Sequence, residues 1–135
     1  MFDWSTVSGT VCPNGVLSLE YDSAHAQMGG DWRMPSKDDI YELLTFTTNE
    51  WIEDYEGSGV NGRVFTSKKN GNTMFIPAAG IWDGSSVLNQ GDDADLWCAL
   101  LSSVTIVARG LFFGSDDCNI NYFCRCSGIS VRGVI

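Results

Sequence analysis

Most of the cysteines, whose thiols could do covalent or metal chemistry, lie in the last forty residues of the chain. Four of the five cysteines occur there: Cys98, Cys118, Cys124 and Cys126. Only one residue separates Cys124 from Cys126, whereas common zinc sites use a two-residue spacer, and the single histidine, His25, lies in a different segment. We therefore expect no metal, and instead either a disulfide between Cys12 and a C-terminal cysteine or a free thiol that packs as a small apolar side chain.

Acidic side chains are the other possible source of chemistry. Asp92, Asp93 and Asp95 in one loop, or Asp116 and Asp117 in another, carry the oxygen ligands that Ca²⁺ uses. A solvated acidic loop is the simpler interpretation in so acidic a chain. Asp38 and Asp39 are adjacent, which suits a helix N-terminus better than acid–base catalysis, and a lone helical His25 is more often structural than a base. The sequence thus predicts neither an enzyme nor a cofactor.

Short strands and two short helices are expected to position these residues. Apolar alternation interrupted by turn residues predicts two strands within residues 4–21. Asp22-Ser23 can cap a helix that ends at Gly29-Gly30. Ser36 can cap a second helix over residues 36–49, in which apolar residues recur at helical spacing.

The second half of the chain is richer in turns. Two β-favouring runs, residues 64–66 and 73–76, predict a hairpin. Residues 77–80 and 83–95 form a long loop region, and the last forty residues carry the closing strands, the final one at 130–135. Together these patterns predict a single domain over residues 1–135 of the α+β class, with two helices packed on short antiparallel sheets and a loop-rich C-terminal half.

One closing strand predicts which side chains face the core. Alternation along residues 108–114 places Ala108, Gly110, Phe112 and Gly114 on one face and Arg109, Leu111 and Phe113 on the other. Leu111 and Phe113 are the better core pair. Phe112 is therefore expected to point outward.

Four residue types are missing from the same region. Residues 96–135 contain no Lys, Glu, Gln or Met, although residues 1–95 contain all four. These types share no physical property, since Lys and Glu favour solvent and Met favours the core. They share a coding property, because none has a codon that ends in a pyrimidine. The gap indicates a constant frame in which many positions are drawn from a restricted set of codons.

The residues that surround this gap resemble a known family. Residues 24–39, with Gly29-Gly30-Asp31-Trp32-Arg33-Met34-Pro35-Ser36 at their centre, then residues 75–80, Trp97 and residues 128–134, are similar to C-type lectin-like domains of gut bacteria and their phages. That family includes variable proteins diversified by retroelements, and the phage major tropism determinant is a distant fold relative. The resemblance covers about residues 18–135 and implies a C-type lectin-like fold with a variable region at 96–135.

The resemblance also divides the variable region into two sets of positions. Relatives that are not diversified typically have Trp-Ser-Ser where this chain has Trp97-Cys98-Ala99, and such departures resemble adenine-directed mutagenesis of Asn codons. The implied frame comprises Trp97, Leu111, Phe113, Asp116, Cys118, Arg125, Gly128, Ser130, Val131 and Arg132. The implied ligand-binding positions are Cys98, Leu100, Val104, Ile106, Val107, Gly110, Phe112, Gly114, Asp117, Asn119, Asn121, Tyr122, Phe123, Cys124, Cys126, Ser127 and Ile129.

These observations predict a binding protein. A rigid scaffold that presents exchangeable apolar and aromatic side chains suits a protein or cell-surface receptor better than a glycan. A calcium-dependent or calcium-independent carbohydrate-binding lectin or adhesin domain is the alternative, although the Glu/Gln-Pro-Asn/Asp and Trp-Asn-Asp motifs of calcium lectins are absent from the sequence. A monomer or small homo-oligomer on a virion or bacterial cell surface is expected, and no signal peptide is visible.

The charge balance argues against two other classes of partner. The chain has 17 Asp and Glu against 8 Lys and Arg, a formal net charge of −9. Nucleic-acid binding depends on neutralising phosphates with basic side chains, and only Lys68 and Lys69 are adjacent. No apolar run approaches the length needed to cross a bilayer. We therefore expect neither nucleic-acid binding nor membrane insertion.

Overall fold

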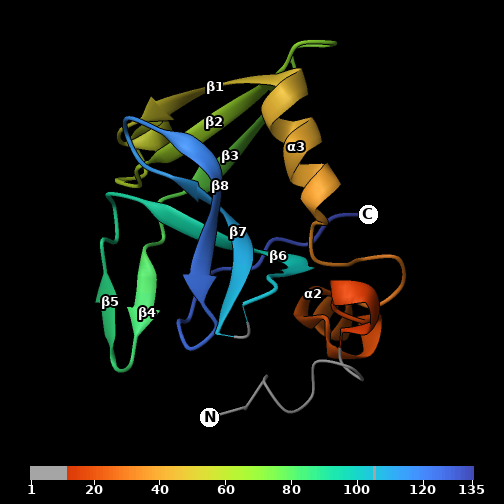
Figure 1. The fold of residues 1–135 in the computed structure, drawn as a ribbon. Helices are drawn as coiled ribbons and strands as arrows, with labels where there is room; N and C mark the ends of the chain where they lie inside the picture. The colour runs from red at the N-terminus through yellow and green to blue at the C-terminus, as the bar shows by residue number, and fades with distance from the viewer. Residues whose placement is uncertain (1–11, 105) are drawn as a thin grey trace.

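A computed structural model of the chain describes residues 12–104 and 106–135, and within them the fold is α+β with three small antiparallel sheets (Figure 1). The helices are α2 (Ser23–Met28) and α3 (Lys37–Phe46), with 3₁₀ turns η1 (Pro13–Gly15), η2 (Leu19–Tyr21) and η3 (Tyr55–Gly57). The strands are β1 (Thr47–Ile52), β2 (Gly62–Ser67), β3 (Thr73–Pro77), β4 (Ile81–Asp83), β5 (Ser86–Leu88), β6 (Ala94–Leu101), β7 (Val107–Phe113) and β8 (Cys118–Cys124). The expected class of two helices with short antiparallel sheets is confirmed.

The first described segment does not form the predicted pair of strands. Asn14 and Gly15 both adopt positive φ and turn the chain through η1. Val16 then forms an isolated bridge with Leu100, and the amide of Leu17 donates to the carbonyl of Ala99 at 2.8 Å. The segment therefore joins the edge of β6. Residues 4–11 of that prediction lie outside the described residues.

Both predicted helices are present, and their caps explain where they begin. The Asp22 carboxylate accepts from the amides of Ala24 and His25 at the start of α2. Ser36 and Asp39 form a reciprocal capping box at the start of α3. The prediction that α3 reaches residue 49 is wrong, because Thr47 begins β1.

The first sheet has the order β1-β2-β3 and covers one side of the core. The predicted hairpin over residues 64–66 and 73–76 is confirmed as β2 and β3, in which Phe65 lies opposite Met74. β1 was not expected, since its residues Thr47 to Ile52 follow a helical pattern without a turn. Ile40 of α3 packs with buried Phe65 and Ile76 of this sheet.

The predicted long loop contains regular structure. β4 and β5 form a two-stranded hairpin, and β6 begins at Ala94. The predicted strand at 130–135 is wrong, because Ser130 and Val134 form only isolated bridges, to Leu96 and Arg33. In Figure 1 the hairpin lies on the opposite side of the molecule from the two helices, with the third sheet between them.

The third sheet has the order β6-β7-β8 and forms the other side of the core. Leu96, Leu111 and Phe113 point from this sheet into the main apolar cluster, where the ring of Phe113 meets that of Phe65 edge to face at 6.2 Å. Phe113 has no exposed surface and Leu111 is 3% exposed. The predicted core pair is therefore confirmed.

Candidate functional site

The register of the third sheet places alternate residues of its three strands on one side, opposite the main core. Three cross-strand sets define this side: Asp95 with Phe112 and Asn119, Trp97 with Gly110 and Asn121, and Ala108 with Phe123. We call it the outer face. Asn119 and Asn121 are exposed, whereas Phe112, Phe123 and Trp97 are half-buried. The outer face thus presents polar and aromatic side chains over a sheet whose other side is packed.

An aromatic pair covers the middle of the outer face. The rings of Trp97 and Phe123 meet edge to face with centroids 6.1 Å apart. Phe123 lies over Gly110, where a Cβ atom would come within 2.8 Å of the ring and collide with the carbonyl oxygen of Leu96. This position requires glycine, because the neighbouring strand and ring fill the space of a side chain.

The structure distributes the predicted ligand-binding positions over several places. The outer face holds Gly110, Phe112, Asn119, Asn121 and Phe123, and Gly114 follows at the end of β7. Val107, Tyr122 and Cys124 have the opposite orientation in the strands. Exposed or half-buried positions beyond these are Leu100, Val104, Ile106, Asp117, Cys126, Ser127 and Ile129. One sheet therefore brings together part of the predicted set.

Three predicted positions are corrected by their burial. Cys98 is 4% exposed and belongs to the main core cluster, because the inward orientation of Leu96 is repeated two residues later. Gly110 is buried beneath Phe123, and Gly114 is buried at the end of β7. Of the aromatic residues, Tyr122 is 50% exposed, but it packs on its own sheet through a hydrogen bond from Arg109 at 2.6 Å.

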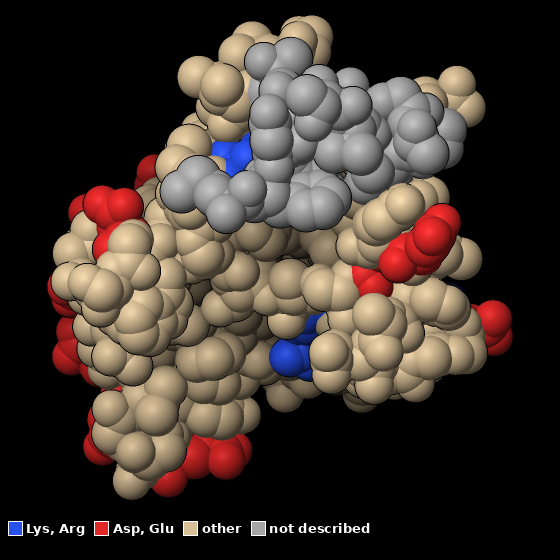
Figure 2. All heavy atoms as spheres, turned by 90° about the horizontal axis from the view of Figure 1, so that it is seen from below, with Lys and Arg blue, Asp and Glu red and all other residues tan. Residues whose placement is uncertain are grey.

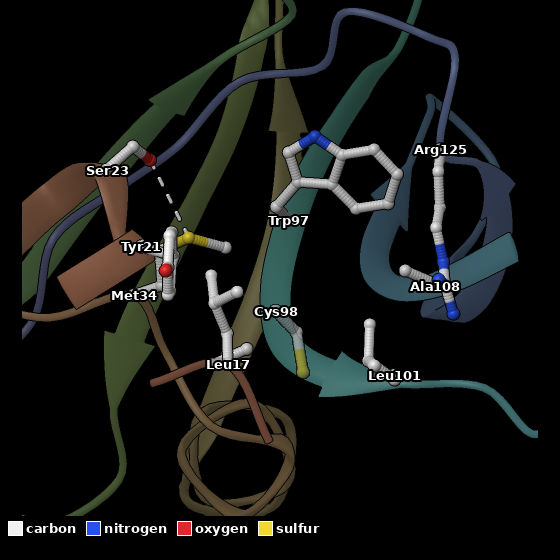
Figure 3. A pocket seen from close by; sticks show the side chains of 10 residues that line it. Leu17, Tyr21, Ser23, Met34, Trp97, Cys98, Leu101, Ala108 and Arg125 are labelled. Carbon is white, nitrogen blue, oxygen red and sulfur yellow. Dashed lines mark hydrogen bonds between the residues drawn. The ribbon is translucent and has the colours of Figure 1, made fainter. Parts of the chain in front are cut away.

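A pocket of about 230 Å³ adjoins the outer face where the register of β6 against β7 shifts between Trp97 and Leu101 (Figure 3). Such a shift spreads two strands and re-aims their side chains. Figure 3 shows Leu17, Tyr21 and Met34 on one side of the pocket and Ala108 and Arg125 on the other. The lining is Leu17, Tyr21, Ser23, Met34, Trp97, Cys98, Ala99, Leu101, Ala108 and Arg125.

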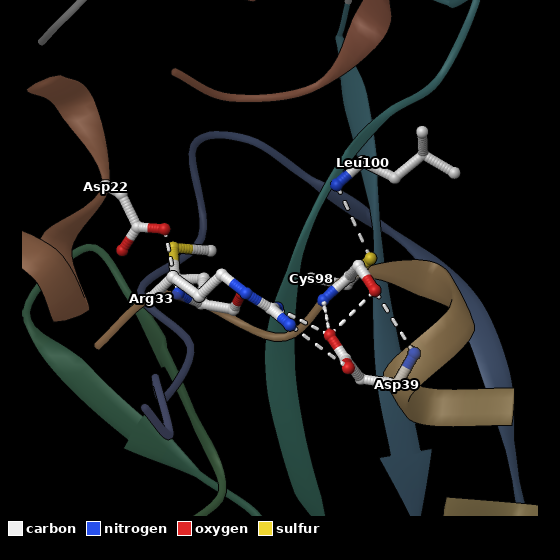
Figure 4. Close-up of polar contacts among 7 residues, drawn as sticks. Asp22, Arg33, Asp39, Cys98 and Leu100 are labelled. Atoms are coloured by element: carbon white, nitrogen blue, oxygen red, sulfur yellow. Dashed lines mark hydrogen bonds and ion pairs between the residues drawn. The ribbon is translucent and has the colours of Figure 1, made fainter. Parts of the chain in front are cut away.

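The wall that carries Met34 is held by a buried carboxylate. Asp22 is 1% exposed and accepts from the amide of Met34 at 2.8 Å as well as from the first turn of α2 (Figure 4). Beside it, Arg33 forms an ion pair with Asp39 at 2.6 Å, and this hydrogen bond holds the pKa of Asp39 well below its usual range. The wall is therefore tied to both helices.

The opposite wall carries the one basic side chain that lines the pocket. Nε of Arg125 donates to the carbonyl oxygen of Val107 at 3.0 Å, and Arg125 lies between Cys124 and Cys126, which form a disulfide. Of the two alternatives expected from the sequence, the bridge from Cys12 is wrong and the free, buried thiol is confirmed. Cys12 is buried and free, and burial raises its pKa. Cys98 and Cys118 are also free, and burial raises the pKa of Cys118 to about 11.

Asp95 is a buried carboxylate at one end of the outer face. It is 5% exposed, and its Oδ1 has no hydrogen-bond partner among the described residues. Burial, together with the neighbouring charge of Asp93, raises the pKa of Asp95 to about 6. In the part of the chain that the structure describes, no group of three or more His, Cys, Asp or Glu side chains has the geometry of a metal site.

Uncharged residues dominate the described part of one face of the molecule. Figure 2 shows a face on which neutral residues cover most of the visible area, while Asp and Glu gather at the edges and few Lys or Arg are seen.

No family model, curated protein or solved structure matches the chain. Among the described helices, neither is long and apolar enough to cross a membrane.

The sequence did not predict the wall of the pocket that carries Met34. Leu17, Tyr21 and Met34 come from segments at least sixty residues before the start of β6 at Ala94. Their apolar character suits a core as well as a binding site, so only the fold distinguishes the two. The family resemblance places Arg125 among the frame residues. The sequence does not show that it lines an apolar pocket, because that position depends on the turn after β8.

Proposed function

We propose that this protein is a non-enzymatic ligand-binding domain with a C-type lectin-like fold, in which a region at residues 96–135 is diversified by retroelement-directed adenine mutagenesis. Its ligand is a protein or cell-surface receptor, which it meets on a virion or bacterial surface. The proposal joins the missing residue types and the family resemblance with the architecture of the third sheet.

The observation that carries the proposal is the register of β7 and β8. Phe112, Asn119 and Asn121 are predicted exchangeable positions, and all three share the outer face. The frame residues Leu111 and Phe113 alternate with Phe112 along the same strand and are buried. At these three positions a side chain can therefore change without removing a core residue, which is what a diversified binding surface requires.

The composition of the outer face suits recognition of another protein. Aromatic side chains supply large contact areas and lose little rotamer entropy, and Asn side chains supply both hydrogen-bond donors and acceptors. Val104 and Ile106, exposed by 53% and 67%, add apolar surface in the turn between β6 and β7. An exposed apolar area beside polar residues is typical of protein interaction sites.

Two matched libraries test the proposal. One randomises Phe112, Asn119 and Asn121 with codons that end in a pyrimidine. The other uses the same codons at Leu111, at Phe113 and at Ile120, which pairs with Leu111 and packs against the main core. We expect most members of the first library to remain folded and most of the second to unfold, measured as the fraction of displayed variants that resist protease. Equal loss of folded protein in both libraries would exclude the outer face as an exchangeable surface.

A further inference from the structure

The pocket beside the outer face has the size of a small organic molecule. Its volume of about 230 Å³ exceeds the roughly 150 Å³ of an engineered protein cavity that binds benzene. Leu17, Met34, Trp97, Leu101 and Ala108 make most of the lining apolar. A phenyl ring with a short aliphatic chain matches this space.

Arg125 is the basic group of this apolar pocket. Its Nε is engaged with the carbonyl oxygen of Val107, while its two terminal nitrogens have no hydrogen-bond partner among the described residues. No carboxylate of the described chain lies within ion-pair distance of it, in contrast to Arg33 with Asp39. The planar end of a guanidinium binds a carboxylate through two parallel hydrogen bonds. Although the chain has a net charge of −9, the positive charge of Arg125 can therefore attract an anion locally.

The positions of both walls are fixed by contacts within the protein. Asp22 holds the amide of Met34 at 2.8 Å, and the hydroxyl of Ser23 contacts the sulfur of Met34 at 3.6 Å. On the other side, the Cys124–Cys126 disulfide and the bond to Val107 restrain Arg125. A pocket built in advance loses less entropy when a ligand binds.

We propose that this pocket binds a small monocarboxylate with an apolar body, either a free acid or the acidic end of a larger ligand. The apolar body lies between Trp97 and Met34, and the carboxylate pairs with the terminal nitrogens of Arg125. The inference deepens the proposed ligand-binding function and rests on it, because the pocket adjoins the outer face. A neutral ligand of the same shape would leave the guanidinium without a partner.

Titration of the full chain with 4-phenylbutyrate and with its neutral amide, 4-phenylbutyramide, followed by two-dimensional NMR, tests the proposal. We expect both compounds to shift signals of Trp97 and Ala108, and the carboxylate to bind about 10- to 100-fold more tightly, the range for hydrogen bonds to a charged group. Arg125→Gln should reduce the affinity for the carboxylate to that for the amide and leave the amide unchanged. Arg125→Lys, which keeps the charge without the planar fork, should fall between.

The matched control is Arg109→Gln, which removes the same charge from β7, outside the pocket, and it should leave both affinities unchanged. Thermal unfolding of each variant separates loss of binding from loss of fold. Equal binding of acid and amide, equal effects of the two Arg→Gln changes, or no binding of either compound at millimolar concentration would each overturn the proposal. If the pocket fails in this way while the outer-face library stays folded, the proposed display function stands without the pocket.

Discussion

At the scale of single residues, Gly110 shows that position on the outer face does not make a residue exchangeable. The absence of a side chain lets β6 and the ring of Phe123 approach β7 closely. Gly114 has the same orientation at the end of the strand, but a Cβ there would meet its nearest atom at 3.6 Å, an ordinary contact. Two glycines that look equivalent in the sequence therefore have different requirements.

This difference predicts opposite results for two identical substitutions. Gly110→Ala should lower the free energy of unfolding by about 1–3 kcal/mol, the range for overpacking a filled site. Gly114→Ala should change it by less than about 0.5 kcal/mol. Urea unfolding of both variants measures the two effects, and a neutral Gly110→Ala would show that Phe123 does not pack over β7.

Asp95 makes stability depend on pH in an unusual direction. The pKa of its folded state, about 6, lies above the unfolded value of about 3.9, so the folded protein holds this proton more tightly. The stabilisation is complete below about pH 4 and is lost as the pH rises through 6, amounting to at most about 3 kcal/mol. Asp39 acts in the opposite sense, since its lowered pKa adds stability that is complete above about pH 5 and is lost progressively as the pH falls below that value.

Asp95→Asn should therefore stabilise the protein at pH 8 and have little effect at pH 4. The substitution removes the charge and keeps the size of the side chain, so the difference isolates the cost of burying a carboxylate. Denaturant unfolding at the two pH values is the measurement, with Asp92→Asn, an exposed neighbour, as the control. If Asp95→Asn changed the free energy of unfolding equally at both pH values, the result would contradict the raised pKa of Asp95.

At the scale of elements, the helix N-caps could be predicted from the sequence, whereas several strands could not. Asp22 and Ser36 precede helical spacing in the sequence, and both act as N-caps in the structure. The strand β1 and the β4-β5 hairpin were missed because their short runs lack a clear alternation. The burial of Cys98 depends on its place in the same core cluster as Leu111 and Ile40, which local sequence does not reveal.

The two caps should differ in their contribution to stability. Asp22→Ala leaves three backbone amides without an acceptor, one of them at Met34 in a separate segment, and should cost at least about 3 kcal/mol. Ser36→Ala removes an ordinary cap and should cost about 1 kcal/mol. Thermal unfolding compares them, and equal losses would show that Asp22 does not tie α2 to the wall of the pocket.

At the scale of the whole molecule, the third sheet has one packed side and one side turned away from the core. Its inner side packs against α3 and the first sheet, and its outer face presents the side chains proposed to vary. The sequence could predict the inner pair Leu111 and Phe113 because their alternation is local. It could not predict the pocket, because the walls with Met34 and Arg125 meet only in the folded chain.

The coding DNA tests the central claim most directly. The account predicts a near-copy of the segment that encodes residues 96–135, close to a reverse transcriptase gene and differing from it mainly at adenines. When the mismatches are placed on the strand register, they should include the codons for Phe112, Asn119 and Asn121 and exclude those for Leu111 and Phe113. A copy whose mismatches fall on the codons for Leu111 and Phe113 as often as on those for Phe112, Asn119 and Asn121, or a locus without such a copy, would contradict the claim that this region is diversified around a fixed core.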